Sequence, residues 1–113
     1  SILNNDNFDK LSHMYSNTIN RFYDNYNIDK NDAISLAKSY KPNHKIISTT
    51  NKIRWETFKI KNIDNISVIQ FTMDYEIFRE DKSKPSIFVL SIVIEVNSNE
   101  KIQSIYENIL ARA

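Results

Sequence analysis

The chain has 113 residues, a formal net charge of +1, no cysteine and no glycine. A chain of this length can bury a core without disulfides or metal, and we expect one domain over residues 1–113. The near-neutral charge gives no electrostatic reason to expect nucleic acid as a partner. Lack of glycine excludes glycine-rich phosphate loops, and lack of cysteine excludes thiolate zinc sites and cysteine nucleophiles.

The first part of the sequence has a helical period. Apolar and aromatic residues recur there at steps of three and four: Phe8, Leu11, Tyr15, Ile19, Phe22 and Tyr26. This spacing predicts one long amphipathic helix from Asn5 to Asn27. Asp29 or Asn31 can cap a second, shorter helix that ends at Pro42, because the residue before a proline avoids helical backbone.

After Pro42 the pattern changes to that of β-strands. Residues 45–49 predict a short strand, and Ile53–Ile63 predict another with Trp55 as its aromatic anchor. Asp64-Asn65 is the turn that follows. No apolar run reaches the roughly 20 residues of a membrane-spanning helix.

The C-terminal part alternates apolar and polar residues most clearly. The alternation predicts strands at Ser67–Glu80 and Ser86–Asn97, joined as a hairpin. Ser98-Asn99-Glu100 is a tight turn in which asparagine can take the left-handed conformation, and Lys101–Glu107 is the last strand. The sequence therefore predicts an α+β fold, with N-terminal helices packed on a strongly curved antiparallel sheet.

Few residues suggest catalysis or metal binding. His13 and His44 have no second histidine or carboxylate at ligand spacing, so we expect no metal site and no cofactor. Asp74 and Glu76 are two positions apart on one strand and share its polar face, which points toward solvent. The sequence therefore predicts no catalytic residue.

Five aromatic residues are candidates for a ligand-binding pocket between helices and sheet: Tyr15, Phe22, Tyr40, Trp55 and Tyr75. The simpler interpretation is that these amphipathic rings fill the core, with their hydroxyls at its wet edge. The pocket interpretation rests on the curved sheet, which beneath few helices leaves a cone open at one end. A small apolar ligand is the partner that such a cone would bind.

One strand is apolar on both faces. Phe88, Leu90 and Ile92 face one side, while the opposite face carries Ile87, Val89 and Val93. A strand that is apolar on both faces is typically covered on both. We therefore expect an interface at Ile87, Val89 and Val93, most simply a homodimer through the outer face of the sheet.

The chain resembles the NTF2-like (cystatin-like α+β) superfamily over nearly its whole length. The resemblance lies in RFYDNYN at residues 21–27, KIRWETFKI at 52–60, VIQFTMDYEIF at 68–78 and IVIEVNSNEKIQSIYE at 92–107. It implies a cone-shaped fold, shared by enzymes such as ketosteroid isomerase and by non-catalytic accessory domains of bacterial cell-wall transpeptidases. The enzymes direct Asp, His or Tyr into the cone, whereas here the core-facing strand positions are apolar apart from Tyr75.

The resemblance therefore favours a non-catalytic module that binds a ligand or a partner, such as a cell-wall protein. The alternative is a small isomerase or cyclase acting on an apolar, ring-bearing substrate in the cone. We expect an extracytoplasmic location, because the chain begins at Ser1 and its nearest analogues are exported; the alternative is the cytoplasm.

Overall fold

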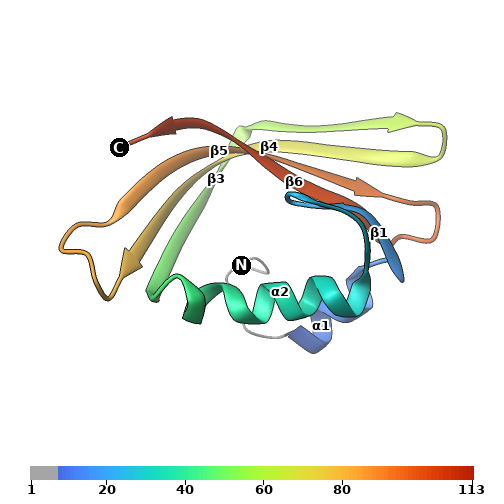
Figure 1. Cartoon of the computed structure of the whole chain (residues 1–113). Coiled ribbons are helices and arrows are strands. Elements are labelled where there is room, and N and C mark those ends of the chain that lie inside the picture. Colours follow the sequence, from blue (N-terminus) through green and yellow to red (C-terminus); the bar gives the residue numbers. More distant parts are fainter. Residues whose placement is uncertain (1–7) are drawn as a thin grey trace.

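The computed structural model describes residues 8–113, which form two helices and six strands. Their order is α1 (Phe8–Met14), β1 (Thr18–Phe22), β2 (Asn25–Asp29), α2 (Lys30–Asn43), β3 (Ile46–Ile63), β4 (Ile66–Arg79), β5 (Ser86–Val96) and β6 (Ile102–Arg112). The strands make one sheet in the order β2-β1-β6-β5-β4-β3. The sheet arches over α2, which lies on its concave side (Figure 1). The prediction of an α+β fold with a strongly curved sheet is confirmed.

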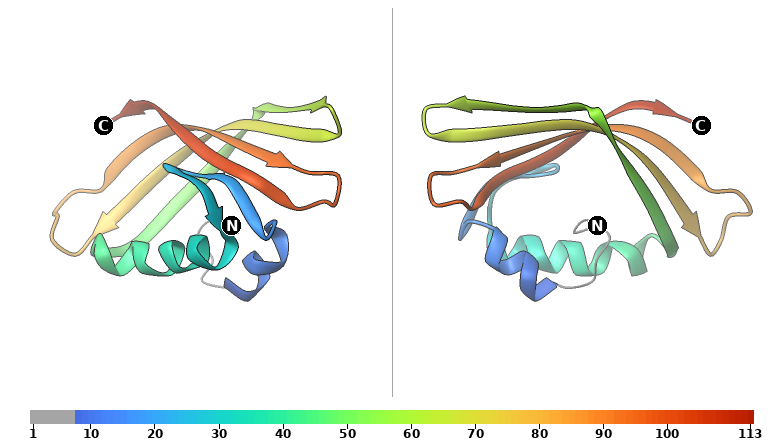
Figure 2. Two further views of the ribbon diagram at one scale, coloured as in Figure 1. Left: turned by 45° about the vertical axis from the view of Figure 1, so that its right-hand side comes forward. Right: turned by 180° about the vertical axis from the view of Figure 1, so that it is seen from behind.

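The arch is closed at one end by the chain's earliest described strands. Views from two further directions place α1 and the β1–β2 hairpin at one end of α2 and the start of β3 at the other (Figure 2). β1 pairs with β6 in parallel, with Phe22 opposite Ile105, whereas every other strand pair is antiparallel. Within residues 8–113, neither helix is long and apolar enough to cross a membrane.

The hydrophobic core consists of two clusters on the concave side. The first contains Tyr15, Ile19, Phe22, Ala33 and Ile105, and it joins α2 to β1 and β6. The second contains Phe71, Met73, Leu90 and Ile92, and it lies on β4 and β5. Ile94 packs against both clusters, so the two share one continuous apolar layer. Each of these buried residues of the two clusters is at most 7% exposed.

The prediction of one long helix from Asn5 to Asn27 is wrong. Residues 5–7 lie outside the described part of the chain; α1 ends at Met14, and residues 18–29 form the β1–β2 hairpin. Tyr23 adopts a positive φ of 55° in the tight turn between these strands. β-branched and aromatic residues suit strands, and the pairing of β1 with β6 outweighs the helical spacing.

The second helix is close to its prediction. Asp29 is the N-cap, and its carboxylate accepts a hydrogen bond from the Asn31 backbone N–H at 3.1 Å. Pro42 does not end the helix, since α2 includes Pro42 and extends to Asn43. The helix therefore runs slightly beyond its predicted end. Its last turn is closed by the His44 backbone N–H, which donates to the Tyr40 carbonyl oxygen at 3.1 Å.

The strands of the second half differ from prediction mainly in length. Residues 46–63 form one continuous edge strand with a register shift between Arg54 and Lys59, where separate strands were predicted. The hairpin of β4 and β5 is confirmed, and β6 continues beyond Glu107 to Arg112.

Two turns between strands contain residues with positive φ, the left-handed conformation. Asp64 and Asn65 both have positive φ, at 48° and 67°, so the predicted turn between β3 and β4 is confirmed. In the β5–β6 turn the residue with positive φ is Glu100, at 61°, and not an asparagine. Asn97 stabilises that turn instead, because its Oδ1 accepts hydrogen bonds from the backbone N–H groups of Asn99 and Lys101 at 3.0 and 3.1 Å.

Candidate functional site

Four tyrosines from four different parts of the chain gather on the concave side. We call Tyr15, Tyr23, Tyr40 and Tyr75 the tyrosine cluster. Tyr15 precedes β1, Tyr23 lies in the β1–β2 turn, Tyr40 is on α2 and Tyr75 is on β4. The curvature of the sheet brings them together, since each is near enough to Tyr23 to raise its pKa by charge repulsion.

Aromatic contacts fix the inner end of this cluster. The rings of Tyr15 and Phe22 meet edge to face with centroids 6.0 Å apart, and those of Phe22 and Tyr23 do so at 4.9 Å. Burial raises the pKa of Tyr15 to about 12, and burial is also the main reason that the pKa of Tyr23 is raised. Both hydroxyls therefore stay protonated at neutral pH and remain hydrogen-bond donors.

The outer end of the cluster is more open. Tyr40 is 43% exposed, whereas Tyr75 is half-buried and forms a hydrogen bond with Thr49. Partial burial raises the pKa of both hydroxyls, and Glu107 adds to this effect, while the guanidinium of Arg79 opposes it. The outer end therefore combines aromatic surface with charged groups of both signs.

Glu107 is the carboxyl group of this site. It lies on β6 opposite Ile92, on the face that carries the core, and two positions after the buried Ile105. Desolvation raises the pKa of Glu107, and repulsion by Asp24 raises it further. Its side chain nevertheless remains accessible, so Glu107 can exchange protons with a molecule on the concave side.

Asn51 on β3 adds an unsatisfied donor beside the tyrosines. It is in register with Tyr75 across the β3–β4 pair. Its Nδ2 atom is buried and, among the described residues, has no hydrogen-bond partner. A buried amide without a partner is unfavourable by about 1–3 kcal/mol, so such a group in a folded protein calls for an acceptor.

The sequence missed three of these residues. The helical spacing predicts a helix through Tyr23, and Asn51 lies between two predicted strands. Glu107 lies at the end of the last predicted strand, for which no inward or outward face is predicted. The face of Glu107 could have been predicted from the two-residue period of a strand. Glu107 follows Ile105 by two positions, so the two side chains share one face.

The five predicted pocket residues are not all brought together. Tyr15 and Phe22 are buried in the first core cluster, and Tyr40 and Tyr75 lie at the outer end of the tyrosine cluster. Trp55 is 66% exposed and contacts Phe58, with ring centroids 5.7 Å apart, so it does not converge with the other four residues between helices and sheet.

The acidic pair on β4 lies on the convex face, as predicted. Asp74 is in register with Val89, and Glu76 with Ile87. Arg54 holds Asp74 through two hydrogen bonds, from Nε at 3.0 Å and from the terminal nitrogen Nη2 at 2.7 Å. This hydrogen bonding lowers the pKa of Asp74, so the residue carries charge at the surface and is not poised to transfer protons.

The predicted interface residues also lie on the convex face, next to these carboxylates. Ile87 is 37% exposed and Val89 is half-buried, whereas Val93 is only 7% exposed between its register neighbours Gln70 and Tyr106.

The two histidines, His13 and His44, are both exposed. His44 forms a hydrogen bond through Nδ1 with the Tyr40 carbonyl oxygen at 2.9 Å. Residues 8–113 contain no cluster of three or more potential metal ligands.

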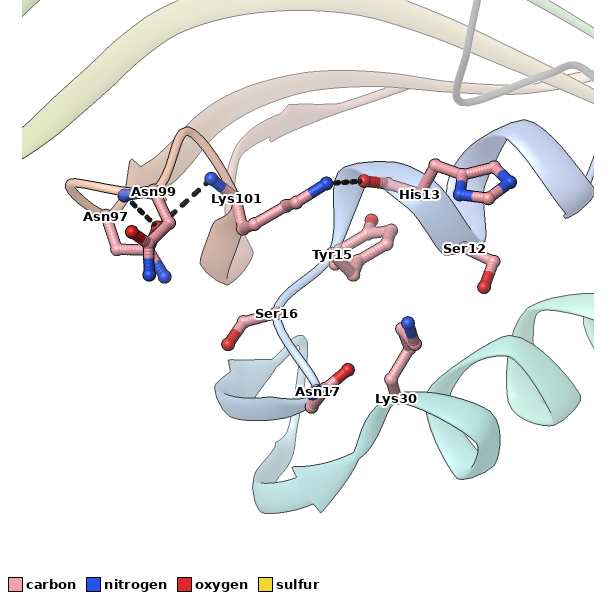
Figure 3. A pocket seen from close by; sticks show the side chains of 9 residues that line it. All are labelled: Ser12, His13, Tyr15, Ser16, Asn17, Lys30, Asn97, Asn99 and Lys101. Atoms are coloured by element: carbon pink, nitrogen blue, oxygen red, sulfur yellow. Dashed lines mark hydrogen bonds between the residues drawn. The ribbon is translucent and has the colours of Figure 1, made fainter.

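A second concave region lies outside the tyrosine cluster. It is a hollow of about 380 Å³ between α1, the segment before β1, the start of α2 and the β5–β6 turn. Lys30 and Lys101 approach it from opposite sides, with Tyr15 between them (Figure 3). We call it the polar hollow, because serine, asparagine and lysine side chains make up most of its wall.

No protein-family model matches the sequence, and no curated protein matches it. Solved structures do match. A protein from Kribbella flavida superimposes with a TM-score of 0.78 at 9% identity, covering 99% of this chain and 83% of its own. A protein from Catenulispora acidiphila with a ketosteroid isomerase-like fold, in complex with trimethylamine, gives 0.65 at 13% identity, covering 94% and 77%. An M. tuberculosis LEH-like epoxide hydrolase gives 0.64 at 12% identity, covering 95% and 73%.

These similarities define the class of fold. The chain has the NTF2-like cone fold, in which helices pack on the concave side of a curled sheet. At these identities they show the fold alone, and proteins with this fold include both enzymes and non-catalytic binding domains. None of the three is described as a transpeptidase domain.

Proposed function

We propose that this chain is a ligand-binding domain whose concave face binds a small, largely apolar molecule carrying an oxygen acceptor. The observation that carries the proposal is the buried Nδ2 atom of Asn51, which lacks a partner among the described residues and lies beside Tyr75. Binding sites for small molecules are mostly apolar, with a few convergent polar groups. The tyrosine cluster supplies the aromatic wall, and Asn51 and Glu107 supply the polar groups.

Because Asn51 Nδ2 is buried, the amide would turn toward the ligand on binding and donate to its oxygen, while the apolar part of the ligand contacts the rings of Tyr40 and Tyr75. This arrangement satisfies a buried donor and covers aromatic surface in one event. The Catenulispora acidiphila structure supports the binding of small organic molecules by this fold, since it is a complex with trimethylamine.

The test compares the variants Asn51→Leu and Asn108→Leu with the wild type. Asn108 is exposed on the convex face of β6, opposite Ser91, and serves as the matched control. Cyclohexanone is the first probe, followed by larger ring ketones, and binding is measured by NMR titration. We expect the Asn51 amide signals to shift, and Asn51→Leu to weaken binding about tenfold. Equal binding by Asn51→Leu and wild type would refute the proposal.

A second candidate function is an enzyme of the isomerase or cyclase class at the same site. The specific observation is Glu107, a concave carboxyl group whose pKa is raised by desolvation. A carboxyl group with a raised pKa keeps its proton to a higher pH than an ordinary glutamate, which suits it to general acid–base catalysis. Turnover of a ring ketone that Glu107→Gln abolishes while the ketone still binds would favour the enzyme over the binding domain.

The predictions of association and location remain proposals. A homodimer through the convex face is supported by Ile87, which is exposed, and by Val89 beside it. A role next to cell-wall transpeptidases and an extracytoplasmic location are supported only by the resemblance of the sequence. Pull-down of a transpeptidase from the native host, lost on substitution of Val89 by Glu, would link the two proposals.

A further inference from the structure

The polar hollow has an unbalanced charge. Its wall includes two lysines, Lys30 and Lys101, and no aspartate or glutamate. Among the described residues, the ammonium group of Lys30 has no hydrogen-bond or ion-pair partner, although its side chain is half-buried. Two cationic groups that share a partly enclosed space repel each other, and an anion between them would relieve this repulsion.

Lys101 is held in place and still has donors to spare. Its Nζ donates to the main-chain carbonyl oxygen of His13 at 2.6 Å, which ties the β5–β6 turn to α1 (Figure 3). An ammonium group has three donors, so two remain available to a ligand. Neither of the acidic residues adjacent to these lysines in sequence lines the hollow: Asp29 caps α2, and Glu100 is exposed.

Neutral donors complete the wall. The Oδ1 atom of Asn97 already accepts two backbone hydrogen bonds, so its Nδ2 is left to donate. Ser12, Ser16 and Asn17 add two hydroxyls and an amide from the opposite side. A phosphate group has several acceptor oxygens and no need for donors, and it matches a wall of ammonium, amide and hydroxyl groups.

We propose that the polar hollow is an anion-binding site that takes the phosphate group of a small molecule between Lys30 and Lys101. A volume of about 380 Å³ lies within the range of small-molecule sites, so the hollow has room for more than an isolated ion. The site is separate from the concave tyrosine cluster and shares only Tyr15 with it. The proposal does not depend on the function proposed for the concave face.

The test is an NMR titration of the whole chain with inorganic phosphate at constant ionic strength. We expect a dissociation constant on the order of 1 mM, with the largest shifts at Lys30, Asn97 and Lys101. Lys30→Gln should weaken binding about tenfold, since it removes one charge-assisted contact and breaks no hydrogen bond or ion pair among the described residues. Lys101→Gln should weaken binding similarly, with an added loss of the bond to His13.

The control is Lys82→Gln, which removes an exposed lysine from the β4–β5 connection. Equal weakening by Lys82→Gln and Lys30→Gln would mean that phosphate senses only net charge, and would overturn the proposal. Shifts that avoid the hollow would do the same. A parallel titration with acetate identifies the chemical class: acetate binding as tight as phosphate binding would refute the assignment to a phosphate group.

Discussion

The substitution Ile92→Ala tests the register on which the candidate site depends. Ile92 is 1% exposed and lies between Phe71 on β4 and Glu107 on β6. Removing its side chain beyond Cβ leaves a cavity in the second core cluster and should destabilise the chain by about 2–5 kcal/mol. Total stabilities are about 5–15 kcal/mol, so this is a large fraction of the whole. For a chain of this size, the melting temperature should fall by about 8–20 °C.

The matched control is Ile47→Ala, the same chemical change at a residue that is 69% exposed near the start of β3. Its effect should stay within about 0.5 kcal/mol. Urea unfolding and differential scanning calorimetry of both variants measure the difference. Equal losses at the two positions would mean that β5 is displaced by one residue. Since a shift by one residue exchanges the faces of a strand, the placement of Glu107 relative to Ile92 would then also fail.

Three further predictions concern surface and site. The folded chain binds the Glu107 proton more tightly than the unfolded chain, and this proton therefore stabilises the fold. The stabilisation is fully present below the ordinary pKa of 4.5, which applies to the unfolded chain, and it is lost as pH rises through the raised pKa of the folded chain. Glu107→Gln should therefore gain stability relative to wild type in urea unfolding on going from about pH 4 to about pH 7, and a constant difference would contradict the raised pKa. Trp55 should fluoresce as a solvent-exposed indole, readily quenched by iodide, whereas strong protection from quenching would place it in an interface. Val89→Glu should convert a dimer to a monomer in sedimentation; a wild-type monomer at high concentration would exclude an interface of more than about 1,000 Å² on that face.

The second half of the fold could be predicted because local pattern and tertiary structure agree there. The alternation in β4 and β5 assigns the faces of both strands, and the register confirms it, with Met73 opposite Leu90. The Asp64-Asn65 turn was also readable, since these residues tolerate positive φ better than most. Of the two predicted caps, Asp29 and Asn31, the structure has Asp29, because its side chain accepts from a backbone N–H at the start of α2.

The first half could not be read in the same way. The spacing of Tyr15, Ile19 and Phe22 suits a helical face, yet all three enter the core from an extended segment. The deciding interaction is the pairing of β1 with β6, which local sequence does not encode. The candidate site was affected by the same limit, because Tyr23 becomes part of it only through the turn after β1.

The pairing of β1 with β6 also has a consequence for the order of folding. The Ser16 N–H donates to the Ile102 carbonyl oxygen at 2.9 Å, and Lys101 bonds to His13 across 88 positions of the chain. Contacts between such distant segments carry a high loop-closure entropy and slow folding. During synthesis, β1 and β2 leave the ribosome early and can pair with each other, but they join the rest of the sheet only when β6 follows. We therefore expect the cluster around Tyr15, and with it the wall shared by the two candidate sites, to assemble last and in a single step.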